Sequence, residues 1–147
     1  MKHALLALVF LFPFFAQAQT PLDNPNITFT LRYETVMELR QAVAVPDLQT
    51  AIASATLGLT DTSKGVELTL SEIDLVQTYR ALSNQPAWIG SPLIDAILAA
   101  IGPQLKQHPY AASTIAQIAK DNANRRKQLF KAGQKANENL QKAIDNN

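Results

Sequence analysis

The sequence of 147 residues contains no cysteine, one tryptophan and two histidines. The absence of cysteine excludes disulfides, cysteine nucleophiles and the common zinc clusters. The chain also has no Gly-x-Ser-x-Gly turn, no glycine-rich phosphate loop and no calcium-binding loop. We therefore predict no catalytic, cofactor-binding or metal-binding residue. An enzyme without a recognisable motif is the third of three function classes considered below.

The first eighteen residues have the pattern of a signal peptide. Lys2 and His3 form a short basic start, residues 4–15 are almost all apolar, and Ala16-Gln17-Ala18 ends the segment. The apolar run is about a dozen residues, whereas a permanent transmembrane helix needs roughly twenty. We therefore expect cleavage after Ala18 and a periplasmic or secreted protein with no permanent transmembrane helix. A cysteine-free exported chain fits a bacterial periplasm or exterior.

Two short segments alternate apolar and polar residues, as strands with one buried face do. They are residues 27–33 and 66–70. Each strand alone would leave the backbone N–H and C=O groups of its edges unpaired, so the two strands are expected to hydrogen-bond to each other. The sequence therefore predicts a two-stranded β-ribbon.

Apolar residues at helical spacing follow each of these strands. The first strand precedes helices over residues 34–44 and 46–57. The second precedes a helix capped by Ser71, a break over residues 84–90, and a helix that starts with Ser91 and Pro92. Gly102 and Pro103 are expected to kink or end that helix, because proline removes an amide and clashes with the preceding turn.

These segments predict a mainly α fold, namely a helical domain with a small two-stranded β-ribbon and a long C-terminal helix. Two strand–helix–helix units are a further expectation, because each strand is followed by two helices. Residues 19–109 would form the strand and helix body. Residues 110–147 contain no proline and are rich in Ala, Lys and Gln, so they would form a long basic helix. This helix would either continue the body or project from it.

Three sequence motifs resemble a small strand–helix–helix module that is found in phage and bacterial proteins. They are VELTLSEIDL at residues 66–75, ALSNQP at 81–86 and PLIDAI at 92–97. The resemblance covers residues 66–106 and implies a short strand, an acidic-capped helix, a proline turn and a second apolar helix. The module has no agreed activity, so the resemblance implies no chemistry.

The charge is divided unevenly along the chain. Residues 19–119 contain five bases and nine acids, whereas residues 120–147 contain seven bases and three acids. A basic helix attached to an acidic body can bind an acidic partner. The alternative is that the charged side of this helix is simply solvated. Within this helix Phe130 is isolated between Lys127 and Lys131. A fully solvated helix would not need a phenylalanine at this position.

The predicted partner-binding residues are therefore Trp88 and a group in the C-terminal helix. That group consists of Arg125, Arg126, Lys127, Leu129, Phe130, Lys131, Ala136 and Leu140. Trp88 has two interpretations, because tryptophan anchors interfaces and also closes corners between helices.

Three function classes follow. The first is a small exported interaction or structural protein that self-associates or binds another protein chain through the C-terminal helix. The second is an envelope-surface binder that attaches to anionic lipid or polysaccharide through the basic helix; nucleic acid is not an expected partner. The third is the enzyme without a motif.

Two smaller expectations concern titratable residues. Glu72 and Asp74 lie at a helix start, where they would complement the helix dipole. His108 precedes Pro109 at the start of the last helix, so a capping or solvent-facing role is expected for it.

Overall fold

The chain is built on a two-stranded antiparallel β-ribbon. The computed structural model describes residues 23–145, so the predicted signal peptide lies outside the described residues. Strand β1 (Asn26–Leu31) pairs with β2 (Val66–Ser71), and Ile27 lies opposite Leu70. The ribbon predicted from the alternating pattern is confirmed.

Only one face of the ribbon is buried. Ile27 and Phe29 of β1 and Leu68 of β2 point into the core, while the residues between them are exposed. On the exposed face the hydroxyls of Thr28 and Thr69 lie 2.9 Å apart and hydrogen-bond across the strands. The alternation in sequence therefore directs the apolar side chains to the helices and the polar ones to solvent.

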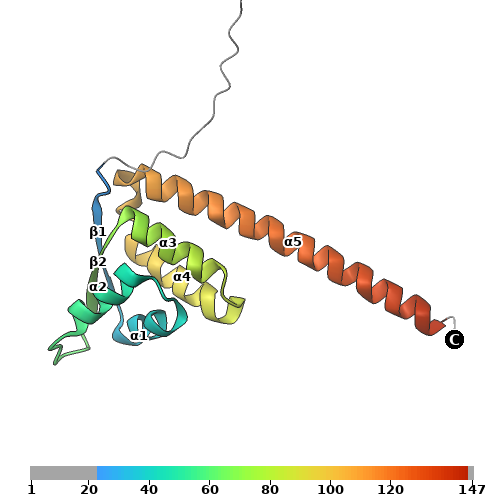
Figure 1. The fold of residues 1–147 in the computed structure, drawn as a ribbon, viewed down its shortest axis with the longest axis horizontal. Helices are drawn as coiled ribbons and strands as arrows, with labels where there is room; N and C mark the ends of the chain where they lie inside the picture. Colours follow the sequence, from blue (N-terminus) through green and yellow to red (C-terminus); the bar gives the residue numbers. More distant parts are fainter. Residues whose placement is uncertain (1–22, 146–147) are drawn as a thin grey trace, which may run out of the picture.

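The helices complete the mainly α fold that the sequence predicts. In the described residues they are α1 (Tyr33–Ala42), α2 (Pro46–Thr56), α3 (Glu72–Ser83), α4 (Ala87–Ile101), the short 3-10 helix η1 (Leu105–Gln107) and α5 (Pro109–Asp145) (Figure 1). Helix α2 packs on β2, α4 packs on β1, and α3 packs on both α4 and α5. The order strand, helix, helix occurs twice before α5, which agrees with the two expected units.

Helix α4 begins earlier than the sequence predicts. Its first residue is Ala87, after Pro86 in an extended conformation, so Pro92 lies inside the helix and Ser91 is not its cap. The predicted break over residues 84–90 is wrong for its second half. The helix ends at Ile101, where Gly102 and Pro103 were expected to kink or end it.

A glycine explains why this helix packs closely on the preceding one. Gly90 is buried, and a Cβ atom placed on it would overlap the carbonyl oxygen of Leu82 in α3. The first turns of α4 can therefore approach the C-terminal turn of α3 only because residue 90 has no side chain.

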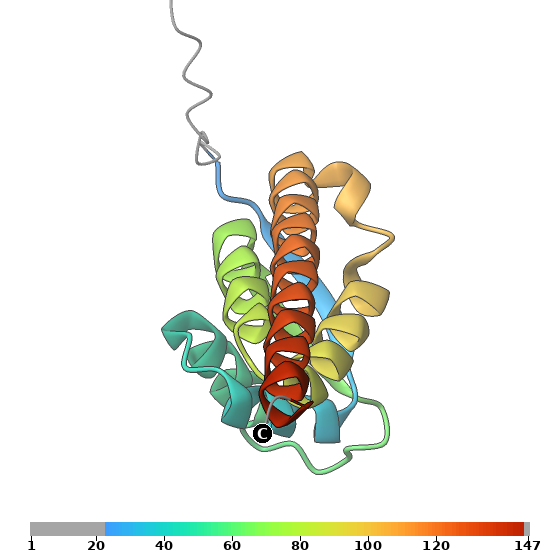
Figure 2. The ribbon, with the colours of Figure 1, turned by 90° about the vertical axis from the view of Figure 1, so that its right-hand side faces the viewer.

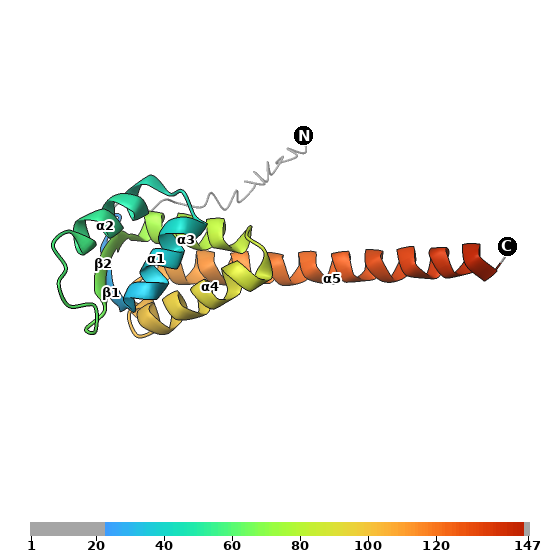
Figure 3. The same ribbon diagram turned by 90° about the horizontal axis from the view of Figure 1, so that it is seen from below.

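Helix α5 is continuous and much longer than the body. Its 37 residues extend about 55 Å at 1.5 Å per residue. We call residues 109–122 the root and residues 123–145 the arm. The root packs on α3, and Ala111 and Ile115 are buried there. Every residue of the arm is exposed. Figure 3 shows the arm projecting beyond the body as a straight helix.

The end-on view places α5 relative to its neighbours. In Figure 2 the helix points towards the viewer, with α3 on one side and α4 on the other. The root of α5 therefore packs on the body, and the arm projects from it.

Candidate functional site

The root of α5 is fixed by a buried polar contact. Nδ1 of His108 lies 2.6 Å from Oε1 of Glu72, the first residue of α3. The Glu72 side chain is 3% exposed and the His108 side chain is 12% exposed. The second carboxyl oxygen of Glu72 is buried and has no hydrogen-bond partner in the described part of the chain. This contact joins the start of α3 to the start of α5.

Glu72 and Asp74 both lie in the first turn of α3, as expected of acids that complement the helix dipole, and other groups accept hydrogen bonds from the first amides. The Pro25 carbonyl accepts from the amide of Glu72, and Asn24 Oδ1 accepts from the amide of Ile73. The Ser71 hydroxyl accepts from the amide of Asp74, which confirms the predicted cap. The solvent-facing role expected for His108 is wrong, since its ring is directed at Glu72.

The arm has one apolar face. On a helix of 3.6 residues per turn, Leu129, Gly133, Ala136 and Leu140 recur at spacings of four, three and four and share one side. Phe130 and Ile144 flank that side along one edge. We call these six residues the apolar face of the arm. Its four large side chains are between 60% and 67% exposed, so they contact little of their own chain.

This face continues the face that packs on the body. Ala111, Ile115 and Ile118 of the root lie in the same row as Leu129 and Leu140 of the arm. The root residues are buried or half-buried against the core, and the arm residues are not. The apolar row thus continues along α5 well beyond the root, which is the part of the helix that the body covers.

The lysines of the arm lie on the opposite side. Lys127, Lys131, Lys135 and Lys142 recur at spacings of four, four and seven and form a lysine face. Of the residues predicted to bind a partner, Leu129, Phe130, Ala136 and Leu140 are thus brought together, while Lys127 and Lys131 point away from them. Arg125 and Arg126 lie at the start of the arm, next to the body.

A hollow lies where the arm leaves the body. Ser83, Asn84, Gln85 and Ala87, from the connection between α3 and α4, line it on one side. Asn122, Arg125, Arg126 and Leu129 of α5 line it on the other. The first exposed leucine of the arm therefore borders a concave surface of the body.

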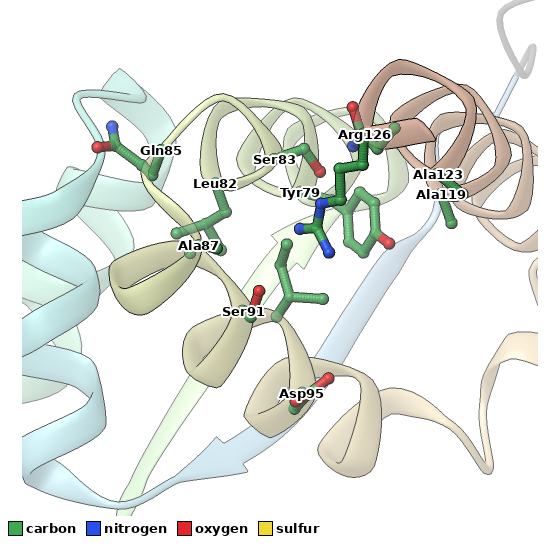
Figure 4. Close-up of a pocket in the computed structure, with 13 residues that line it drawn as sticks. Tyr79, Leu82, Ser83, Gln85, Ala87, Ser91, Asp95, Ala119, Ala123 and Arg126 are labelled. Atoms are coloured by element: carbon green, nitrogen blue, oxygen red, sulfur yellow. The ribbon is translucent and has the colours of Figure 1, made fainter. Parts of the chain in front are cut away.

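A second, more polar pocket lies between α3, α4 and α5 (Figure 4). Its volume is about 200 Å³, and Tyr79, Ser83, Asp95 and Arg126 are among its lining residues. In Figure 4 the Arg126 side chain reaches from α5 towards Tyr79 and the first turns of α4. The sequence did not predict this pocket, because its residues come from three helices whose relative positions no local pattern gives.

The phenol of Tyr79 is affected by this environment. Burial raises its pKa above the usual value of 10.0, and the negative charge of Asp95 adds to this effect. The positive charge of Arg126 acts in the opposite direction and lowers the pKa of Tyr79. Tyr79 therefore stays a neutral hydrogen-bonding group at neutral pH.

The pocket does not contain a catalytic set that we can recognise. Asp95 is the one carboxylate among its lining residues and could act as a general base, but within residues 23–145 no hydrogen bond joins it to a hydroxyl that could act as a nucleophile. His108 is engaged with Glu72 elsewhere. Among residues 23–145, no three His, Asp or Glu side chains gather as a metal site would require. Across the same residues, no helix combines the length and hydrophobicity that membrane crossing demands.

Trp88 lies in a different place from the arm. It is 79% exposed in the first turn of α4, so it does not close a corner between helices. It borders a hollow between α1 and α4 that Glu38, Ile89 and Leu93 also line, and no residue of α5 contributes to this hollow. The structure therefore separates Trp88 from the other predicted partner-binding residues.

Comparisons with protein-family models, with curated proteins and with solved structures found no match to this chain.

Proposed function

We propose that this chain is a small exported interaction protein that self-associates through the apolar face of its arm. The observation that carries the proposal is the exposure of Leu129, Phe130, Leu140 and Ile144 on a helix that no other element of the described chain covers. Exposed apolar side chains that are clustered on one helix face are typical of a surface that binds another chain.

The length of the arm supports this proposal. A helix gains most of its stability in proteins from packing of an apolar face, and isolated helices are marginal in water. The arm spans residues 123–145, or about 35 Å, and it receives no such packing from its own body. A second chain laid along the apolar face would supply it.

Charge supports a second copy as the occupant. The described body, residues 23–119, contains nine acids and five bases, and the arm contains six bases and two acids. Opposite net charges on two parts of one chain attract one copy to another.

Light scattering after size-exclusion chromatography tests this proposal on the chain that begins at Gln19. Replacing Leu129 with Lys should convert an associated species into a monomer, because it places a charge in the apolar contact. Replacing Gln134 with Lys, which adds the same charge on the side of the lysine face, is the matched control and should leave association intact. A monomer at all concentrations for the unaltered chain would refute self-association.

The lysine face supports a second candidate function. Lys127, Lys131, Lys135 and Lys142 on one side of a helix suit attachment to an anionic envelope surface such as anionic lipid or polysaccharide. Binding to phosphatidylglycerol vesicles would decrease with salt and with replacement of these lysines by Gln. Binding that persists in both conditions would not support this candidate.

Export is tested separately. Protein recovered from outside the cytoplasm should have an intact mass that begins at Gln19 or at its cyclised form. Cytoplasmic protein that retains Met1 would contradict the proposed location.

A further inference from the structure

We infer that two copies pair their arms in an antiparallel arrangement, so that the tip of each arm lies at the hollow where the other arm leaves its body. This inference rests on the proposed self-association and adds the orientation, the register and the contact with the body.

Residue spacing along the arm supports helix pairing. From Arg126 onwards, positions 126, 129, 133, 136 and 140 alternate spacings of three and four, as the core positions of a coiled coil do. Leu129 and Leu140 are the large residues at these positions, and Gly133 and Ala136 between them are small. Small residues at the centre let two helix backbones approach closely, and the leucines close the contact on either side.

The charge along the arm selects the antiparallel orientation. Residues 123–134 contain four bases and no acid, while residues 135–145 contain two bases and two acids. A parallel pair would place both strongly basic stretches side by side and would also bring two acidic bodies together. An antiparallel pair places each basic stretch beside the nearly neutral tip of the other copy and sets the bodies at opposite ends.

The register follows from the positions of the leucines. When Leu129 of one copy lies opposite Leu140 of the other, Gly133 lies opposite Ala136, and both contacts occur twice because the pair is symmetric. This register uses nearly the whole arm. One face of α5 then contacts α3 along the root and the second copy's arm along its own arm. The partner helix thus occupies, beyond the body, the side of α5 that α3 occupies within it.

The hollow beside the arm accommodates the end of the second helix. Ser83, Gln85 and Ala87 form its wall on the body side, and Arg125 and Leu129 form its wall on the arm. In the antiparallel register the last turns of the second copy, which include Ile144 and Asp145, reach this level of the helix. In this register Ile144 lies at the level of the partner's Arg125 and Asp145 at the level of its Asn124, so the Asp145 carboxylate would lie near the Arg125 guanidinium.

Cross-linking between single-cysteine variants tests the orientation directly, because the chain has no cysteine of its own. The two variants of the full chain from Gln19 are Leu129→Cys and Leu140→Cys. Mixed in equal amounts and oxidised, they should form a disulfide between residue 129 of one copy and residue 140 of the other. Each variant alone should form none, because equivalent positions would lie about 16 Å apart along the axis.

The possible outcomes separate the inference from the proposed function. A disulfide between two copies of Leu140→Cys, with no link between residues 129 and 140 in the mixture, would show parallel arms and overturn the inference while self-association stands. A dimer by light scattering with no cross-link in any sample would overturn this register. A monomer for the unaltered chain at all concentrations would overturn both the inference and the proposed function, and binding of that chain only to anionic vesicles would favour the second candidate.

Discussion

The contact between Glu72 and His108 should be one of the most sensitive points of the fold. Replacing His108 with Leu leaves the Glu72 carboxylate in a site where it is 3% exposed and has no other hydrogen-bond partner among residues 23–145. Leaving a buried carboxylate without its hydrogen-bond partner typically costs about 1–3 kcal/mol or more. We expect about 3 kcal/mol here, which is a large part of the roughly 5–15 kcal/mol that stabilises an ordinary domain.

A double-mutant cycle separates this contact from the general effect of each substitution. Replacing Glu72 with Leu should cost less than replacing His108, about 1–2 kcal/mol, because a neutral imidazole is cheaper to leave unpaired than a carboxylate. The double variant with Leu at both positions should lose less stability than the sum of the single variants, by about 2 kcal/mol. Urea denaturation followed by circular dichroism gives these free energies of unfolding. The coupling free energy is the difference between the loss in the double variant and the sum of the losses in the single variants. A coupling free energy below about 0.5 kcal/mol would refute the buried contact, because independent sites give additive losses within that range.

Further predictions concern the core, the pocket and the arm. Replacing Gly90 with Ala should lower the free energy of unfolding by about 1–2 kcal/mol, measured by urea denaturation, because the added methyl overlaps a backbone carbonyl. Replacing Arg126 with Gln should raise the pKa of Tyr79 in an ultraviolet titration, because a charge that lowers this pKa is removed; an unchanged or lower pKa would contradict the geometry of the pocket. Replacing Leu140 with Ala should weaken dimerisation by about 30–100-fold, because two side chains per dimer each lose about 1–1.5 kcal/mol of burial. Replacing Lys142 with Ala is the control and should change it less than about threefold.

Local patterns in the sequence predicted the secondary structure where one physical cause was dominant. The alternation in residues 66–70, the Ser71 cap and the proline-free stretch after Pro109 each predicted an element that the structure contains. The start of α4 was missed because Ser91 and Pro92 look like a helix start. Pro86 in fact sets that start, and the glycine at residue 90 makes the early turns pack on α3.

The site was predictable only in part. The exposed apolar residues Leu129, Phe130 and Leu140 could be recognised because they lie in one helix and helical spacing is known. The contact between Glu72 and His108 joins residues 36 apart in sequence, and the pocket around Tyr79 needs three helices in place. Neither has a local signal, because both depend on how α5 packs on α3.

Sedimentation equilibrium of the chain that begins at Gln19, compared with the same chain ending at Asn124, tests the central claim most directly. The shorter chain keeps the whole root of α5 and should therefore melt cooperatively, as circular dichroism would confirm. We predict a concentration-dependent dimer for the full chain and a monomer for the shorter one. The same oligomeric state for the two chains, whether both are monomers or both are dimers, would contradict the claim that the arm is the self-association surface.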